Sequence, residues 1–312
     1  METKHFTSFD GSTIVYDVLG KGKKKVFLLH GLMNDRTTWL NIARALTFFH
    51  KDLTVYVPEL RAHGRSTNNK FDSLTPFLDI ARDIDGLANS VLQEGEKAIL
   101  VCYSLSVVPG IMMQKYGLGQ WVEKYFILDH PLEFVKDDPI RTYFWAMGKE
   151  FEEKGISVQK YIDENKTYCE NLNLEDVPED YKKQCKRIHE IIVHCSLYNG
   201  RLGFLKNLGS ILNETMMIFS TSFYTKWMQY NSIGSHYFYE ELDLGEVLRD
   251  SKIPTEFGVG MKNGVFYSDW NIETINKWMP GSKVYKFHHS GHAILTTEPI
   301  NVYKALKEAI GL

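Results

Sequence analysis

Short apolar runs alternate with longer amphipathic stretches through the first half of the chain. Strands buried on both faces of a parallel sheet have nearly continuous apolar runs, and crossover helices separate them. This alternation predicts an α/β fold with a doubly wound, mostly parallel sheet. The predicted strands lie at 25–29, 53–57, 98–102 and 125–129, with helices between them such as 40–48 and 73–93.

The two ends of the chain extend this pattern. Residues 5–19 read as two amphipathic strands around the turn Asp10-Gly11-Ser12, which predicts an N-terminal hairpin. Near the C-terminus the alternation of strand and helix resumes. The expected strands are 255–259 and 283–287, and the expected helices are 270–278 and 300–310.

Residues 132 to about 248 have a different pattern. They lack convincing strand alternation and are rich in Glu, Lys, Tyr, Phe and Met, with apolar positions at helical spacing. At 312 residues, the chain also exceeds the length of about 250 at which a single core stops growing. We therefore expect a sheet domain, formed by 1–131 and 249–312, that is interrupted by a helical domain at 132–248. The helices expected in this insertion are 141–153, 158–164, 178–198, 204–218 and 223–230.

A serine stands at the junction between the third apolar run and the next helix. The segment Ala98–Gly110 predicts a buried strand, a sharp turn that carries Ser104, and a helix. The residues two positions to either side, Cys102 and Ser106, are small, as a tight turn requires. Ser104 is therefore a candidate nucleophile, and the alternative is a serine that only caps the helix.

Three further motifs occur in order along the chain. The first, Val26–Trp39, runs from an apolar strand into His30-Gly31. The second, Pro58–Ser66, reads PELRAHGRS and follows a predicted strand. The third, Lys283–His292, passes from a strand into a loop with three histidines, and Thr297-Glu298-Pro299 follows it.

Together with the Ser104 turn, these motifs resemble the α/β-hydrolase superfamily over residues 26–299. The resemblance implies the α/β-hydrolase fold, with Ser104 as nucleophile and His292 as general base. It also implies that the insertion is a cap that folds over the nucleophile. The second motif departs from the family pattern D-x-R-G-x-G-x-S, because Glu59 and Ala62 replace its Asp and Gly.

The same resemblance implies how the reaction is assisted. In the family, the residue after His-Gly supplies one amide of the oxyanion hole, and the residue after the nucleophile supplies the other. These residues are Leu32 and Leu105 here. The expected reaction is hydrolysis of an ester or thioester through an acyl-enzyme on Ser104. No cofactor or metal is expected.

The acid of the triad departs from the family pattern. Its usual position follows the strand at 254–260, where this chain has Asn263. The corresponding Asp-to-Asn change in a serine protease lowers turnover about ten-thousandfold. Some relatives, the haloalkane dehalogenases among them, carry the acid at the end of the preceding strand, which here delivers Asp129. We expect Asp129 to be the acid. In the alternative interpretation, Asp129 is not catalytic and only bonds loop amides. The acid is then Asp269, or Ser104 and His292 act as a dyad without an acid.

The substrate class and two rival functions follow from these features. The many aromatic residues of the insertion favour a small to medium, mostly apolar substrate. Dehalogenases and epoxide hydrolases of this fold attack with an elbow aspartate, and Ser104 argues against both. Hydrolysis of a carbon–carbon bond in a diketone remains an alternative reaction. Asn263 also leaves open a lyase or cyclase, and a small-molecule receptor or pseudoenzyme.

Composition limits the partners. The net charge is −3 and the basic residues are scattered, which disfavours a nucleic-acid partner. The chain has no apolar run of about eighteen residues and begins with polar residues, so we expect a cytoplasmic protein without a membrane span. Its four cysteines form no closely spaced pair, which argues against a disulfide framework or a zinc site. The oligomeric state is left open.

Overall fold

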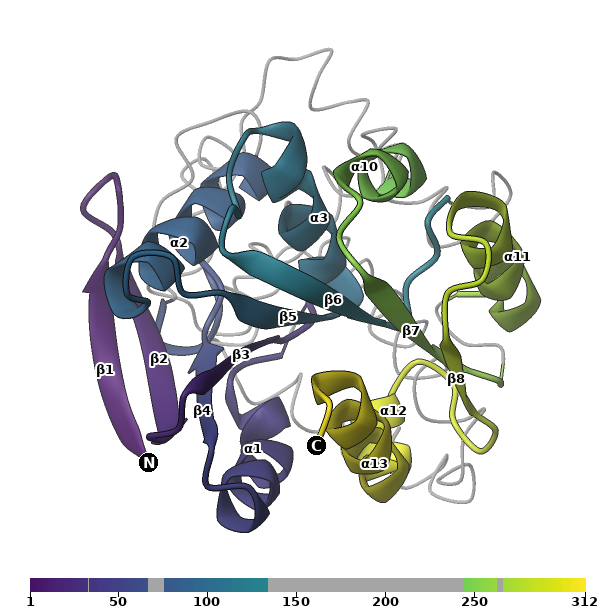
Figure 1. The fold of residues 1–312 in the computed structure, drawn as a ribbon, viewed down its shortest axis with the longest axis horizontal. Helices are drawn as coiled ribbons and strands as arrows, with labels where there is room; N and C mark the ends of the chain where they lie inside the picture. Colours follow the sequence, from purple (N-terminus) through teal and green to yellow (C-terminus); the bar gives the residue numbers. More distant parts are fainter. Residues whose placement is uncertain (33, 67–75, 134–243, 263–265) are drawn as a thin grey trace, which may run out of the picture.

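A single eight-stranded sheet organises the chain (Figure 1). The computed structural model describes residues 1–32, 34–66, 76–133, 244–262 and 266–312. The strands are β1 Glu2–Thr7, β2 Thr13–Gly20, β3 Lys24–Leu29, β4 Leu53–Pro58, β5 Ala98–Tyr103, β6 Val122–Leu128, β7 Thr255–Gly260 and β8 Val284–Phe287.

The sheet is mixed only at one end. Its strand order is β1-β2-β4-β3-β5-β6-β7-β8; β2 is antiparallel to both β1 and β4, and all pairs from β4 to β8 are parallel. The chain moves outward in one direction from β3 to β4 and in the other direction from β5 to β8. The carboxyl ends of β3 and β5 therefore flank the point where the strand order reverses, which is where open α/β sheets bind their ligands.

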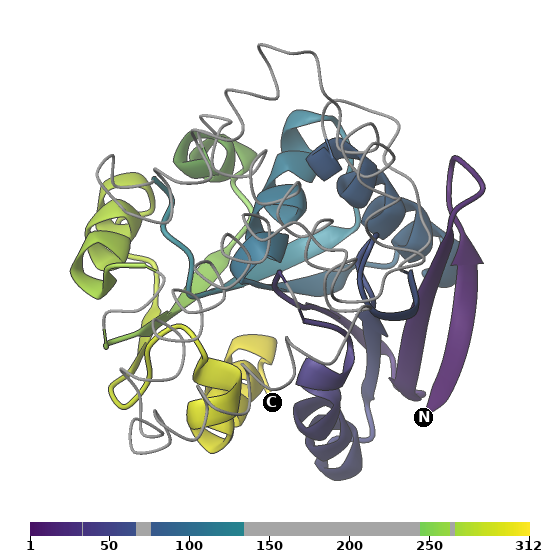
Figure 2. The same cartoon turned by 180° about the vertical axis from the view of Figure 1, so that it is seen from behind.

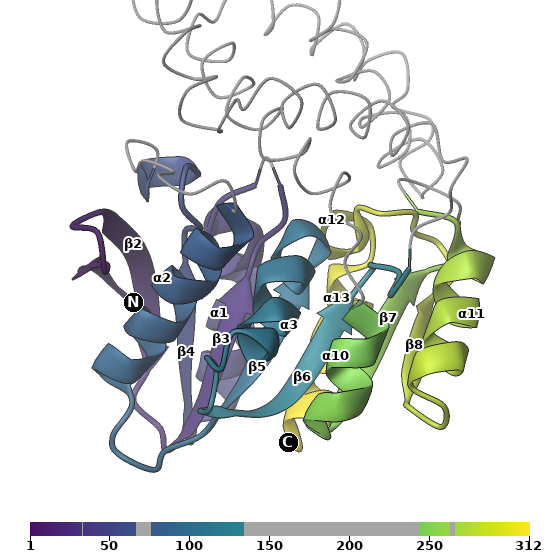
Figure 3. The same cartoon turned by 90° about the horizontal axis from the view of Figure 1, so that it is seen from above.

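Helices cover both faces of the sheet (Figures 1 and 2). With its strands upright, as in Figure 3, the face toward the viewer carries α2, α3 and α10, and α1 and α13 lie behind. The helices are α1 Thr37–Phe49, α2 Pro76–Val91, α3 Val107–Lys115, α10 Leu244–Ser251, α11 Ser268–Trp278, α12 Ile294–Thr297 and α13 Pro299–Ile310, with short 3-10 turns η1 Gly64–Ser66 and η2 Ser104–Ser106.

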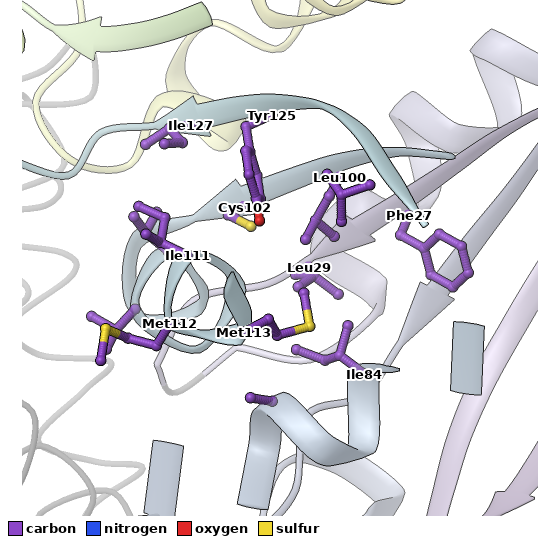
Figure 4. Packing of buried hydrophobic residues seen from close by; sticks show 14 of the residues in the cluster. Phe27, Leu29, Ile84, Leu100, Cys102, Ile111, Met112, Met113, Tyr125 and Ile127 are labelled. Carbon is purple, nitrogen blue, oxygen red and sulfur yellow. The ribbon is translucent and has the colours of Figure 1, made fainter. Parts of the chain in front are cut away.

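Alternate residues of the central strands supply two separate cores. On β5, Leu100 and Cys102 belong to the cluster under α2 and α3, whereas Val101 and Tyr103 belong to the cluster under α1 and α13. Figure 4 shows side chains of β5 and β6 directed toward Ile111 of α3. Each fully buried aliphatic or aromatic side chain contributes about 1.5–3 kcal/mol, so these clusters hold the strand ends rigidly.

The predicted fold class is confirmed, as are the hairpin and the parallel strands. The predicted strand at 125–129 begins earlier, at Val122, and ends at Leu128, so Asp129 is the first residue after β6. Exposed Glu123 and half-buried Lys124 interrupt the apolar run, so the sequence pattern does not show where β6 begins.

Most of the predicted insertion, residues 134–243, lies outside the described residues, as do Asn263 and the cap helices. The predicted boundary at 248 falls inside α10. Leu244 and Leu248 of this helix are buried in the cluster with α3. The division into core and cap stays a prediction. In the described ranges, no helix has both the length and the apolarity to cross a bilayer.

Candidate active site

The turn after β5 presents Ser104 at the carboxyl edge of the sheet. Ser104 has a φ of 56°, a left-handed conformation that costs a residue with a side chain about 1 kcal/mol or more. The 3-10 turn η2 follows at once and leads into α3. The chain thus makes the sharp strand-to-helix turn that the sequence predicts, with the serine at its apex.

The small residues on either side of Ser104 have separate roles. A Cβ on Gly110 of α3 would lie 2.5 Å from the Cys102 Sγ, so the glycine makes room for a cysteine on β5. The Ser106 hydroxyl accepts a hydrogen bond from the Tyr103 N–H at 2.9 Å and lies 3.2 Å from the Leu29 carbonyl oxygen, to which it can donate. Ser106 therefore ties the turn to the end of β3 rather than only leaving space.

The loop after β3 lies directly against the nucleophile. A Cβ on Gly31 would lie 2.9 Å from the Ser104 Cβ and 3.4 Å from its Oγ. Only glycine fits this approach without displacing the serine. Leu32 follows Gly31, and Leu105 lies in the first turn after Ser104, where backbone N–H groups have no intrahelical acceptor. Of the two residues predicted to form the oxyanion hole, Leu105 therefore follows Ser104 in the sequence, and Leu32 follows a glycine that lies against Ser104.

A buried histidine fixes the start of this loop. The His30 Nδ1–H donates to the Gly31 carbonyl at 2.8 Å, and its Nε2 accepts from the Leu60 N–H at 3.0 Å. Complete burial lowers the pKa of His30 to about 4, so the ring is neutral near pH 7. The neutral tautomer matches both hydrogen bonds and links the loops that follow β3 and β4.

The second sequence motif forms a braced turn after β4. The Arg61 guanidinium is buried and donates to Asp83 at 2.6 and 2.8 Å and to Asp10 at 2.5 Å. Ala62, which replaces the family's glycine, has a φ of 64°. The Glu59 carboxylate accepts from the Arg65 N–H at 2.6 Å. Among the described residues, the contacts of this motif brace the turn after β4, which is a structural role.

His292 lies in the loop between β8 and α12, and a hydrogen-bonded carboxylate supports this loop. Glu298 accepts from the His289 N–H and the Ser290 hydroxyl, each at 2.8 Å, and Thr297 donates to the Ser290 Oγ at 2.5 Å. Burial alone would raise the pKa of Glu298, but the hydrogen bonds that it accepts lower it. An ionised Glu298 therefore holds the loop that carries His292.

Three side chains form a hydrogen-bonded chain across the edge of the sheet. The Ser104 Oγ lies 2.8 Å from the His292 Nε2, and the His292 Nδ1 lies 2.6 Å from the Asp129 Oδ2. An ionised carboxylate only accepts, so Nδ1 carries the proton and Nε2 is free to receive one from the serine. Ser104 and His292 are each 9% exposed and Asp129 is 5% exposed. The three side chains are therefore largely shielded from solvent, but a small part of each remains accessible.

Asp129 is held in place by the neighbouring strand. Its Oδ1 accepts from the Gly260 N–H at 2.8 Å, and its own N–H donates to the Gly258 carbonyl at 2.7 Å. The residue has a φ of 49°, a second left-handed turn at a strand end. The side chain therefore bonds a loop amide and His292 at the same time, so the two readings of Asp129 are compatible.

Aromatic and imidazole rings surround His292. Tyr103 stacks on its ring with centroids 5.3 Å apart, and Phe266 meets it edge-on at 5.2 Å. His130, next to Asp129, lies against Phe266, and burial lowers its pKa to about 3. Because His130 is neutral, Asp129 is the charged group on the Nδ1 side of His292.

The structure brings together most of the residues that the sequence singled out. Ser104, His292 and Asp129 are in direct contact, and their roles remain hypotheses. Asp269 is exposed in the first turn of α11, and His292 bonds Asp129 instead. Asn263 lies outside the described residues.

The sequence did not reveal the residues that support Ser104, His292 and Asp129. Gly31 was noted as part of a motif, but its contact with Ser104 was not foreseen. The amide of Gly260 and the ring of Phe266 come from a segment read only for its acid. Tyr103 precedes the nucleophile directly, and that position was the one available signal.

Comparisons with known proteins agree with this fold. A model of the alpha/beta hydrolase family matches residues 26–135. No curated protein matches the chain. Three similar solved structures have a TM-score of 0.66 each. They are a thermophilic esterase from Thermogutta terrifontis (18% identity, covering 99% of this chain and 97% of that one), an esterase from Exiguobacterium antarcticum (16%, covering 100% of both) and the Cif epoxide hydrolase from Acinetobacter nosocomialis (14%, covering 99% and 88%).

The family model matches the part of the chain that carries Ser104, and the whole chain shares the α/β-hydrolase fold with these solved structures. At such low identity, the likeness to solved structures concerns the fold. The solved relatives carry different names, esterase and epoxide hydrolase, so the reaction has to be argued from this chain's own residues.

Proposed function

We propose that this protein is a serine hydrolase that cleaves an ester or thioester through an acyl-enzyme on Ser104. The observation that carries the proposal is the unbroken hydrogen-bonded chain from Asp129 through His292 to Ser104. A serine hydroxyl is a poor nucleophile until a neighbouring base takes its proton, and this geometry supplies the base.

Acylation uses both ring nitrogens of His292. The Nε2 takes the proton of the Ser104 hydroxyl while the Oγ forms a bond to the carbonyl carbon, and the carbonyl electrons move to its oxygen. The imidazolium that forms keeps its Nδ1–H on the Asp129 carboxylate, which remains ionised. When the carbon–oxygen or carbon–sulfur bond breaks, Nε2–H protonates the leaving group. The acyl group then remains on the Ser104 Oγ.

Deacylation repeats these steps with water. The neutral His292 takes a proton from a water molecule, and the resulting hydroxide attacks the acyl carbon. Collapse breaks the bond to the Ser104 Oγ, which recovers its proton from His292. The products are one carboxylic acid and one alcohol or thiol for each water consumed.

The oxyanion of each tetrahedral intermediate requires donors on the Ser104 side of the substrate. We assign this role to the backbone N–H groups of Leu32 and Leu105. The close approach of Gly31 to Ser104 and the position of Leu105 in the first turn after Ser104 support the assignment. Removing one such donor in a protease costs about 10²–10³ in turnover.

Two observations favour a hydrolase over the rival functions. A lyase, a cyclase or a receptor gained support only from Asn263, because it suggested a histidine without an acid. The 2.6 Å contact between Asp129 and His292 supports a displaced acid instead. The elbow residue Ser104 likewise distinguishes the proposed chemistry from attack by an elbow aspartate.

A fluorophosphonate probe tests the proposal directly. We expect the wild-type chain to gain one phosphonyl group, detected by intact mass, and peptide mapping to place it on Ser104. Ser104→Ala should not react, Asp129→Asn should react far more slowly, and Asp269→Asn, a matched change at an exposed carboxylate, should react like wild type. A wild-type chain that fails to react would contradict the proposal.

The substrate class can be tested on the same protein. We expect hydrolysis of p-nitrophenyl esters with short to medium acyl chains and of the corresponding thioesters. We also propose the mostly apolar substrate that the aromatic residues of the insertion favour, so charged acyl groups should be poor substrates. A preference for charged acyl groups would contradict this part of the proposal.

A further inference from the structure

Tyr103 joins the strand that carries the nucleophile to the loop that carries the base. Its hydroxyl donates to the His292 backbone carbonyl at 2.7 Å, and its ring stacks on the imidazole at an interplanar angle of 24°. We propose that Tyr103 is a positioning residue that holds the His292 ring between Asp129 and the reacting centre. The inference rests on the proposed function and extends it to the step in which Ser104 is acylated.

His292 needs such support because neither a helix nor a strand holds it. It lies in the loop between β8 and α12, and its carbonyl accepts from the Ile294 N–H at 2.8 Å in addition to the Tyr103 hydroxyl. These two hydrogen bonds fix the backbone at His292. The imidazole can still turn about two side-chain bonds unless its neighbours prevent this.

The Tyr103 ring limits that rotation from within the core. Tyr103 is only 4% exposed and belongs to the same apolar cluster as Ile294 and Leu295, which follow the base. A ring packed in this way does not shift readily, because protein interiors are close-packed. Burial also raises the pKa of the Tyr103 phenol, so its hydroxyl remains a donor throughout the working pH range.

The contribution of Tyr103 should be greatest after acylation. In the free protein, the ring of His292 is held by Asp129 at Nδ1 and by Ser104 at Nε2. In the acyl-enzyme, the Ser104 Oγ is bonded to the acyl carbon and has no proton to donate. Asp129 and the packed rings alone then keep Nε2 in place to receive a proton from water. Deacylation therefore depends more on Tyr103 than acylation does.

Tyr103→Phe tests the hydroxyl, and Tyr125→Phe is a matched control. Tyr125 is also a fully buried tyrosine on a central strand, and its hydroxyl donates to a backbone carbonyl, that of Gly110, at 3.1 Å. This carbonyl belongs to α3, and among the described residues the Tyr125 hydroxyl makes no hydrogen bond to Ser104, His292 or Asp129. The two variants lose equivalent hydrogen bonds, so they separate positioning from general destabilisation.

Burst kinetics with a p-nitrophenyl ester resolve the two chemical steps. In Tyr103→Phe, we expect the steady-state rate set by deacylation to fall about fivefold, the size of one lost hydrogen bond, while the burst rate and KM change by less than about twofold. Tyr103→Leu, which also loses the ring, should lose more than Tyr103→Phe. Equal losses in both phases, or an equal loss in Tyr125→Phe, would overturn the inference.

A readout independent of turnover keeps the inference separate from the proposed function. The proton on the His292 Nδ1, held by Asp129 at 2.6 Å, should give a far-downfield proton resonance. We expect faster solvent exchange and broadening of this resonance in Tyr103→Phe, and a wild-type signal in Tyr125→Phe. An unchanged resonance in Tyr103→Phe would overturn the inference even if Ser104 reacts as proposed. If the fluorophosphonate does not react, this resonance still decides whether Tyr103 positions the ring.

Discussion

Ser104 and Asp129 are the first residues after two paired strand ends. Tyr103 of β5 pairs with Leu128 of β6 in parallel register, and the chain leaves both strands through left-handed turns, with φ values of 56° and 49°. The two side chains are therefore neighbours across the sheet edge. His292 bridges them with one ring nitrogen to each. This register explains how an acid after β6 can act with a nucleophile after β5.

Removing the charge of Asp129 should impair catalysis without unfolding the protein. Asp129→Asn keeps an oxygen for the Gly260 N–H but no longer stabilises an imidazolium, so we expect kcat to fall about 10³- to 10⁴-fold with little change in KM. Steady-state ester hydrolysis measures the effect. Asp269→Asn is the control, and a similar loss in that variant would argue that the acid is elsewhere.

The contact between Gly31 and Ser104 predicts a steric variant. In Gly31→Ala, the new Cβ would lie 2.9 Å from the Ser104 Cβ, so either the loop or the nucleophile must shift. We expect the rate of fluorophosphonate labelling to fall about tenfold or more, since a displacement of about 1 Å can cost a hundredfold. Gly95→Ala, at an exposed turn with no heavy atom within 4 Å, should change stability but not labelling. Equal labelling of all three proteins would contradict this contact.

The backbone of Ser104 predicts a difference between two inactive variants. At a φ of 56°, alanine remains strained whereas glycine does not. Ser104→Gly should therefore be more stable than Ser104→Ala by about 0.5–1 kcal/mol, despite the greater flexibility of its unfolded chain. Chemical denaturation of the two variants measures the difference. A more stable alanine variant would show that this turn stores no strain.

Buried histidines predict a loss of stability in weak acid. Burial lowers the pKa of His30 to about 4 and those of His63 and His130 to about 3. The unfolded chain takes up protons at these histidines below about pH 6.5, while the native protein does not. The unfolded state therefore binds more protons, and the free energy of unfolding falls as the pH drops from 6.5 toward 4. At pH 5.5 the loss is about 1.4 kcal/mol for each histidine.

Urea denaturation at pH 7.5 and pH 5.5 measures this dependence. His63→Gln should reduce the difference in unfolding free energy between the two pH values by about one third, since one of three equivalent groups is removed. His288→Gln changes an exposed histidine and serves as the control. The same pH dependence in both variants would contradict the assignment of neutral buried rings.

The sequence predicted those parts of the molecule that depend on local pattern. Continuous apolar runs located the central strands, and the end of one run placed Asp129 at the sheet edge beside Ser104. The start of β6 was missed because Glu123 faces solvent, which breaks the apolar run while leaving the strand paired. A strand at the margin of a core shows such alternation rather than a continuous run.

Contacts between distant segments could not be predicted in this way. The fit of Cys102 against Gly110 and the bond from Tyr103 to His292 depend on how a helix and a loop settle on the sheet. The sequence shows that these residues are small or aromatic, but it does not show their partners. The packing of Leu244 and Leu248 of α10 in the cluster with α3 is another contact of this kind.

The pairing of β5 with β6 has a further consequence for how this chain can change. Backbone hydrogen bonds between two adjacent strands position the proposed nucleophile and acid. The long segment 134–243 follows both residues in the sequence. Changes in the length or composition of that segment therefore need not alter the spacing between Ser104 and Asp129. Because the proposed cap and the proposed nucleophile and acid are encoded in separate stretches of sequence, we expect substrate specificity to diverge more readily than chemistry.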